Sequence, residues 1–467
     1  MKRLIDMTVV MLLLLSTWGC QSYERQPLNL AEFAQGWSVR ELDSEAVKSY
    51  LAQLSGQTGG EGGLDVGDGV SLAEAKAVTL WLNTDLRVSR LQVEGSARSA
   101  SLSDLWDDPE VNLDVLRFVD SMPDPWLSAV GVHFTIPISG RLDATKHAAW
   151  ARHAARLHEL EAEERDTVVA LEERWVTWSA IQSQLELHAT HITSVGEIRN
   201  IADRLVAAGE LTPSDGRVVR LEEEAADAEM HRLKSEARSA RLRVLETMGL
   251  APDAQIELVP SVAVVTPDES ADLVSHPRIQ AAKARYEEAE QNLRLEIARQ
   301  YPDLKLGPIY EDEEGQGRVG LGLSVPIPVF NRNRRFIAEA ATARDVARAA
   351  AIAAFQDLNH AYVQATTQLT GMRAYRQELA DGLAPVVAEQ LDEIKRLAEL
   401  GELDILLLAD ALSRWLEAKS SLLAAQRDEA IAAARVVSMQ SRLRVLPVTE
   451  GIERLSDEFQ SRVGVTP

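Results

Sequence analysis

The chain contains the same order of sequence features twice, and this repetition limits the folds open to it. The segment Phe134-Thr135-Ile136-Pro137-Ile138 returns later as Leu323-Ser324-Val325-Pro326-Ile327. Farther along, Gly-Glu-Leu begins at Gly209 and again at Gly401, at nearly the same offset that separates the two proline segments. Two landmarks that keep nearly one spacing indicate a tandem duplication.

Each copy contains a long stretch that favours helix. Residues 141–205 and 335–400 have very few proline or glycine residues, and each is followed by a second helical pattern, at 213–248 and 404–446. About 60 helical residues, if they form one continuous helix, extend on the order of 90 Å. The sequence therefore predicts a mainly α fold built from duplicated long helical hairpins.

Short alternating segments precede these helices. Apolar residues alternate with small or polar ones over 126–136 and 318–325, and partner segments are predicted at 111–115 and 304–309. Four strands per chain with one apolar face suit a β-barrel between lipid and a watery lumen, although a half-buried soluble sheet has the same alternation. Four strands cannot close a barrel, and lipid does not tolerate an open sheet edge. Strands in a membrane would therefore require several copies of the chain.

The N-terminus carries features of an exported lipoprotein. Lys2 and Arg3 precede an apolar run from Met7 to Leu15, which is typical of a signal peptide. Cys20, the only cysteine, resembles the lipidation cysteine of a bacterial lipoprotein, and the alternatives are ordinary cleavage nearby or a cysteine placed there by chance. The predicted division is a signal peptide (1–19), a lipid-anchored extension with a Gly-rich linker (20–70), a first repeat (71–260), a second repeat (261–447) and a C-terminal tail (448–467).

Composition and motifs argue against several classes of protein. The net charge of −23 disfavours nucleic acid as a partner. No phosphate loop, nucleophile elbow or zinc-protease motif occurs, so we expect neither an enzyme nor a cofactor. His188 and His191 are three residues apart on a helix, but nine scattered histidines and a single cysteine do not predict a dedicated metal site.

The order of these features resembles the TolC-like outer-membrane efflux protein family. The resemblance is carried by the duplicated strand, proline turn and helical hairpin, by Cys20, and by three short motifs: Asn83-Thr84-Asp85-Leu86, His276-Pro277-Arg278-Ile279 and the stretch Val325 to Arg332. The stretch from Val325 to Arg332 is similar to the corresponding stretch in the heavy-metal efflux branch of the family, the CzcC- and CusC-like proteins. Thr84 departs from the proline expected there. The resemblance implies a homotrimer with one outer-membrane β-barrel and a periplasmic α-barrel, lipid-anchored at the outer membrane.

The resemblance also implies where partners bind. The turns between the long helices would dock a periplasmic adaptor. The residues concerned are Leu205, Gly209, Glu210, Leu211, Thr212, Leu397, Gly401, Glu402 and Leu403. Glycine also permits the turn itself, and Thr212 or Asp404 can cap the next helix. Asp215, Asp404 and Asp410 are candidates for an aperture that selects cations.

The predicted function is the exit duct of a tripartite efflux pump, working with the adaptor and an inner-membrane pump of the RND class. Heavy-metal cations are one candidate cargo. Alternatives within the same class are a multidrug or type I secretion duct. An alternative of another class is a lipid-anchored periplasmic coiled-coil scaffold without a pore, for which the alternating strands would have no use.

Overall fold

The computed structural model describes residues 23–38, 69–117, 119, 126–268, 271–313, 316–399 and 404–440. The predicted signal peptide, Cys20, the C-terminal tail and the tip residues Gly401, Glu402 and Leu403 lie outside these residues. The chain divides into two units, residues 1–41 and 42–467. The first contains α2 (Leu30–Ser38), and everything below concerns the second.

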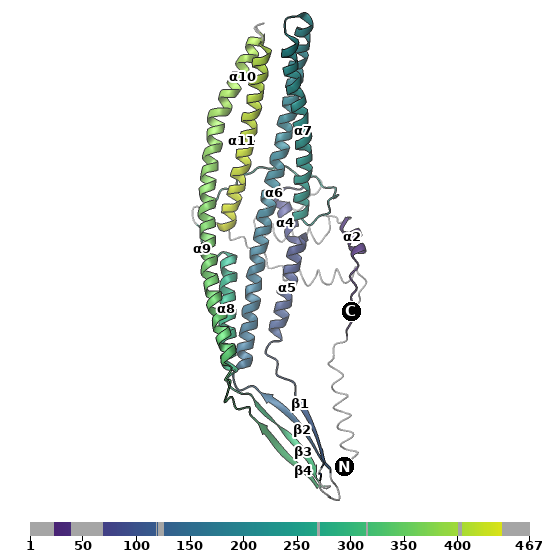
Figure 1. Cartoon of the computed structure of the whole chain (residues 1–467), viewed down its shortest axis with the longest axis vertical. Coiled ribbons are helices and arrows are strands. Elements are labelled where there is room, and N and C mark those ends of the chain that lie inside the picture. The colour runs from purple at the N-terminus through teal and green to yellow at the C-terminus, as the bar shows by residue number, and fades with distance from the viewer. Residues whose placement is uncertain are drawn as a thin grey trace. The chain divides into compact units, whose positions relative to one another are not determined.

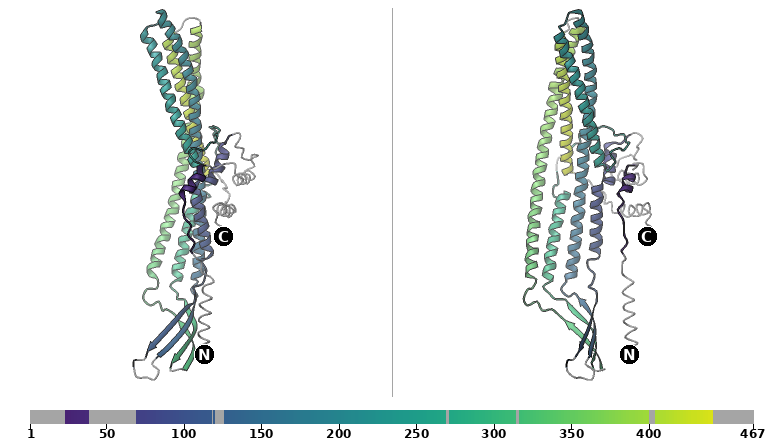
Figure 2. Two further views of the ribbon diagram at one scale, coloured as in Figure 1. Left: turned by 90° about the vertical axis from the view of Figure 1, so that its right-hand side faces the viewer. Right: turned by 45° about the vertical axis from the view of Figure 1, so that its right-hand side comes forward.

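The order of elements occurs twice in the second unit. The first copy contains α4 (Leu72–Leu82), α5 (Thr84–Ser101), β1 (Glu110–Arg117), β2 (Trp126–Ile136), α6 (Arg141–Ala208) and α7 (Pro213–Thr247). The second contains α8 (Pro277–Ala298), β3 (Leu304–Glu313), β4 (Gln316–Ser324), α9 (Arg334–Glu378), the π-helical turn η2 (Leu379–Leu383), α10 (Ala384–Glu399) and α11 (Ile405–Gln440). Figures 1 and 2 show the strands at one end of this unit and the turn between α6 and α7 at the other. The predicted mainly α fold with duplicated hairpins and four strands is confirmed. Within the described ranges, no helix is both long and apolar enough to span a bilayer.

Equivalent capping residues begin α5 and α8, the helices that precede the strands in the two copies. The Asn83 side chain accepts hydrogen bonds from the N–H groups of Asp85 and Leu86, at 3.0 and 3.1 Å. At the same place in the second copy, His276 Nδ1 accepts one from the N–H of Arg278 at 3.2 Å. Each cap satisfies donors that a helix start leaves without partners. The duplication is therefore visible in local chemistry as well as in the order of elements.

The four strands form one antiparallel sheet in the order β1-β2-β3-β4. The central pair, β2 with β3, joins the two copies, and it places Val130 opposite Tyr310 and Phe134 opposite Leu306. The β3–β4 pairing extends as far as Glu313 with Gln316. Glu311 and Arg318 stand opposite each other in this extension, and such opposite charges favour pairing.

The second long helix is interrupted, whereas its counterpart α6 is continuous over 68 residues. The π-helical turn at Leu379–Leu383 separates α9 from α10. Pro385 follows it, and a proline has no N–H to donate and crowds the preceding turn. The wider π turn accommodates this defect, and the N–H of Ala384 reaches the carbonyl of Leu379.

Candidate functional site

The sheet has one apolar and one polar face. By strand alternation and register, Val130 lies between Leu113 and Tyr310, and Leu306 lies opposite Leu323. The exposed apolar members of this face are Val111, Leu113, Val115, Trp126, Val130, Phe134, Val319, Leu321 and Leu323. A broad apolar face without a covering layer in the described chain suits contact with lipid.

The opposite face is polar and rich in glycine. The Lys305 ammonium group contacts both carboxylate oxygens of Glu110 at 2.7 Å. The ring of His133 lies close to Gly131 and Gly322, where an added Cβ would approach ring atoms to 3.0 and 3.1 Å. Charged, small and imidazole groups on this face suit a watery lumen rather than a protein core.

The two outer strands leave the sheet open. β1 pairs with β2 and β4 with β3, and in the described part of the chain no other strand covers them. Open edges that carry apolar side chains do not persist in lipid or in water. Both outer strands therefore need partners that the described chain does not supply.

The turn between α6 and α7 is built by glycine and threonine, as predicted. Gly209 has a φ of 76°, in the left-handed region, and the N–H groups of Glu210 and Leu211 donate to Leu205 O at 2.9 and 3.2 Å. Thr212 caps α7 by accepting from the N–H of Asp215 at 3.2 Å. Glu210 projects into solvent, so the tip presents a polar surface on a fixed backbone.

The second tip is only partly described. Leu397 is exposed near the end of α10, and Asp404 caps α11 by accepting from the N–H groups of Leu406 and Leu407 at 3.1 Å. The three candidate aperture acids all have local partners: Asp215 accepts from the Thr212 hydroxyl at 2.7 Å, and Asp410 pairs with Arg414 at 2.9 Å. Their role at an aperture therefore stays a prediction.

A contact between the hairpins was not predicted from the sequence. Val195 and Val219 of the first hairpin share an apolar cluster with Leu391 and Leu408 of the second. Nearby, the Ser413 hydroxyl of α11 donates to Glu222 of α7 at 2.8 Å. In the sequence, Ile405, Leu408 and Leu412 recur at helical spacing, which is a local signal for an apolar face but does not identify the partner helix. The two tips are thus held at the same end of the unit.

His188 and His191 lie buried in the α6–α7 hairpin, with ring centroids 6.4 Å apart. Burial lowers the pKa of both imidazoles, and the carboxylates of Glu229 and Glu222 oppose this effect. Among the residues that the structure describes, no group of three or more His, Cys, Asp or Glu is arranged to hold a metal ion. We interpret the pair as neutral packing residues.

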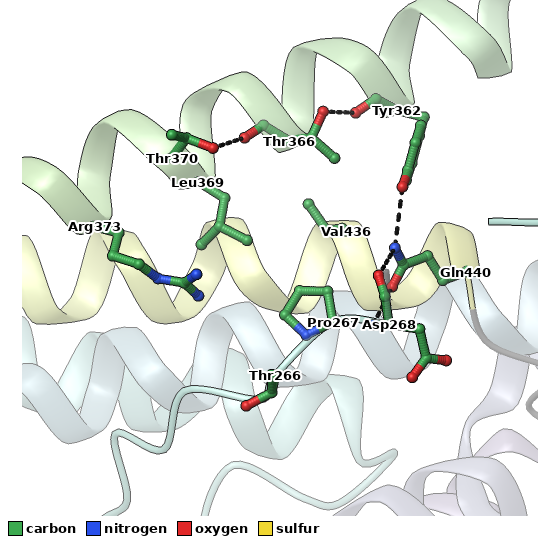
Figure 3. A pocket seen from close by; sticks show the side chains of 10 residues that line it. All are labelled: Thr266, Pro267, Asp268, Tyr362, Thr366, Leu369, Thr370, Arg373, Val436 and Gln440. Carbon is green, nitrogen blue, oxygen red and sulfur yellow. Dashed lines mark hydrogen bonds between the residues drawn. The ribbon is translucent and has the colours of Figure 1, made fainter. Parts of the chain in front are cut away.

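A small groove of about 240 Å³ lies where the segment between the copies crosses α9 and α11 (Figure 3). The Gln440 side chain both accepts from the N–H of Asp268 at 2.8 Å and donates to its carbonyl at 2.7 Å. The Tyr362 hydroxyl also accepts from Gln440, at 3.1 Å. Arg373 at the other end of the groove donates to the buried Glu429 at 3.0 Å. The two bonds between Gln440 and Asp268 fasten the connecting segment to α11, and the other two bonds join α9 to α11.

The buried side chain of His276, which caps α8, makes the stability of the chain depend on pH. Burial, together with the positive charges of Arg165 and Arg278, lowers the pKa of His276 to about 4, against the opposing effects of Asp166 and the Ser438 backbone. Since the unfolded pKa is about 6.5, the contribution of neutral His276 is complete above that pH and is lost as pH falls toward 4. The loss amounts to about 3 kcal/mol.

We therefore expect His276→Asn to flatten the fall in stability between pH 6.5 and 4. Asparagine retains the cap, as Asn83 does in the first copy, but it does not titrate. Unfolding of the detergent-solubilised chain, followed by circular dichroism across this range, measures the effect. Exposed His231 supplies the control variant, His231→Asn. Equal pH profiles for wild type and His276→Asn would refute the assignment.

Comparisons with known proteins agree with this architecture. A family model described as outer membrane efflux protein matches residues 79–250 and 270–442. The cobalt-zinc-cadmium resistance protein CzcC of Cupriavidus metallidurans is 25% identical over 225 residues, or 47% of this chain. The aligned part spans 54% of that relative, about half its length.

Two solved structures share the fold. The outer membrane channel CmeC of Campylobacter jejuni has a TM-score of 0.69 and 12% identity, and covers 94% of this chain and 97% of its own. The outer membrane protein VceC of Vibrio cholerae has a TM-score of 0.67 and 16% identity, with 79% and 96% covered. At these identities the likeness concerns the fold alone.

Proposed function

Because this chain belongs to the outer membrane efflux protein family, we propose that it is the outer-membrane duct of a tripartite efflux pump and works as a homotrimer. The observation that carries this proposal is the sheet, which has an apolar face, a polar face and two open outer strands. Three copies would supply twelve strands, enough to close a barrel with its polar face inward. A coiled-coil scaffold without a pore would have no use for such a sheet.

Assembly and conductance test the duct itself. The full-length chain, purified in detergent, is expected to give the mass of three copies by native mass spectrometry. In a planar lipid bilayer it should produce ion conductance. A monomer without conductance in lipid would reject the duct and favour the scaffold.

We propose heavy-metal cations as the cargo and an adaptor with an RND-class pump as partners. Support for the cargo comes from the similarity to a relative named for cobalt, zinc and cadmium resistance. A duct needs no tight site for what passes through it. Growth of a deletion strain in graded cobalt, zinc, cadmium, copper and silver, beside lipophilic drugs, tests the cargo. Sensitivity to drugs alone would assign the duct to the multidrug class.

The helix tips are the proposed docking surface for the adaptor, and Gly209→Val is expected to impair it. Valine in the left-handed region costs about 1–2 kcal/mol, and relieving that strain would displace the N–H groups bound to Leu205 O. We expect export to fall roughly tenfold, measured as complementation of the deletion strain, with the trimer intact.

The matched control for Gly209→Val is Gly371→Val. Gly371 lies in α9 with open space around an added Cβ and without a positive φ. This variant should export normally. Normal export by Gly209→Val would show that the turn between α6 and α7 is not part of the docking surface.

A further inference from the structure

The apolar alternation of β4 continues after the sheet has ended. Val319, Leu321 and Leu323 belong to the strand, and Val325, Ile327 and Val329 continue the same period. Pro326 and Pro328 lack the N–H groups needed for strand pairing, which accounts for the end of the ladder near Ser324. Ile327 is 80% exposed and Phe330, the next large apolar residue, is 98% exposed. An apolar band therefore passes from the sheet into the connection to α9.

Positive charge follows this band immediately. Arg332, Arg334 and Arg335 are exposed. Arg335 pairs with Glu339 at 2.9 Å, but in the described ranges neither Arg332 nor Arg334 takes part in an ion pair. We call residues 325–335 the rim segment, because it lies where the sheet meets the helices (Figure 1).

The backbone of the rim segment is held in place. Arg332 and Asn333 have φ values of 48° and 53°, which non-glycine residues seldom adopt. The Asn333 amide donates to the carbonyl and to the carboxylate of Glu296, both at 2.7 Å. These bonds fix the turn to the end of α8. The arginines on either side of Asn333 are therefore presented from a defined position.

The first copy lacks this combination. Ile138 is exposed at the equivalent connection, and Arg141 follows it. The Arg141 guanidinium donates to Asp303 at 2.5 Å and also bonds to Asp107, so its charge is matched inside the chain. Only the rim segment of the second copy combines a projecting apolar run with arginines that have no partner in the described chain.

We propose that the rim segment binds anionic phospholipid at the membrane surface where the sheet ends. The inference rests on the proposed function, which places the sheet in the outer membrane. Ile327, Val329 and Phe330 enter the acyl boundary, and the guanidinium groups of Arg332 and Arg334 bind lipid phosphate. Guanidinium groups match phosphate geometry, and basic residues beside a membrane segment attract anionic lipid. The segment thereby fixes the depth of the barrel.

Lipid retention by the purified assembly tests the inference. The full-length chain is titrated in detergent with phosphatidylglycerol or phosphatidylcholine, and bound lipid is counted by native mass spectrometry. Arg332→Gln with Arg334→Gln should weaken phosphatidylglycerol binding roughly 25-fold, about fivefold per arginine, and leave phosphatidylcholine binding unchanged. Phe330→Ser should weaken both lipids. Arg348→Gln, at an exposed position on α9, is the control and should change neither.

The outcomes separate this inference from the proposed function. If the wild-type trimer conducts and the double arginine variant binds phosphatidylglycerol as strongly as wild type does, the lipid site is overturned. The proposed duct is then unaffected. Loss of the trimer in the double variant would show that a neighbouring copy covers the rim segment, and this too would overturn the lipid site. A wild-type chain that neither assembles nor conducts would reject the duct first.

Discussion

Replacing Gly307 with alanine is expected to prevent assembly of the sheet. A Cβ at this position would lie 1.7 Å from the carbonyl oxygen of Val132 and 2.9 Å from the Cα of His133. Both are backbone atoms of β2, so no side-chain rotation can relieve the clash. The strands must separate, and β2 with β3 is the pair that joins the two copies.

The close approach arises from an irregular stretch of this ladder. Pairing is regular at Gly131 with Ile309 and again at Phe134 with Leu306, and it is interrupted between them. Pro308 stands in the interruption and has no N–H to contribute. Glycine allows the backbones to approach closely where the ladder lacks this bond.

We expect Gly307→Ala to reduce the trimer recovered from membranes by at least about tenfold, with conductance lost in proportion. Unboiled gel electrophoresis and bilayer recording measure the two effects. Gly320→Ala is the matched control, since Gly320 is a strand glycine whose Cβ would meet nothing within 4 Å. A Gly307→Ala trimer that conducts like wild type would show that the two strands tolerate a wider spacing.

Local sequence patterns were sufficient to predict most of the fold. The alternation predicted β2 over 126–136, where it lies, because strand period is a property of neighbouring residues. The Ser-x-x-Glu pattern at Ser71 and Glu74 is likewise a local signal, and the two residues form a capping box at the start of α4. Elements with a strong hydrophobic period or a helix cap can therefore be predicted from their own residues.

Features that depend on long-range contacts were not predicted. The clash at Gly307 requires the register of β2 and β3, and the Glu222–Ser413 contact requires the packing of two hairpins. Asp215 accepts a hydrogen bond from the capping hydroxyl of Thr212, and its role as an aperture acid stays a prediction. The break in the second long helix had a local signal, because Pro385 interrupts a stretch, 335–400, that otherwise favours helix.

The second large effect that we predict is on stability, and it comes from breaking a buried ion pair between α5 and α6. Arg90 is 6% exposed and Glu164 is 3% exposed. Arg90 Nε donates to Glu164 Oε1 at 3.1 Å, and Nη1 donates to Leu80 O at 2.6 Å. Burial raises the pKa of Glu164, while the Arg90 guanidinium opposes this rise. Removal of Arg90 leaves a buried carboxylate and a buried carbonyl without their donor.

Arg90→Met is therefore expected to destabilise the chain by about 3–5 kcal/mol at neutral pH. Arg98→Met is the control: Arg98 pairs with Glu94 on the exposed face of α5, and such pairs contribute less than about 1 kcal/mol. Urea unfolding of the detergent-solubilised chain, followed by circular dichroism, measures both. Equal losses of unfolding free energy in the two variants would show that the buried pair contributes no more to stability than the exposed pair does.

The pH dependence identifies the unpaired carboxylate as the cause. Without Arg90 the folded pKa of Glu164 rises further above its unfolded value. The folded state then binds a proton that the unfolded state releases, so stability is greatest at low pH and falls as pH rises. Arg90→Met should consequently lose less stability at pH 5 than at pH 8. Arg90→Met with Glu164→Leu removes both charges and should recover most of the loss at pH 8. A double variant as unstable as Arg90→Met would instead assign the loss to the unsatisfied carbonyl of Leu80.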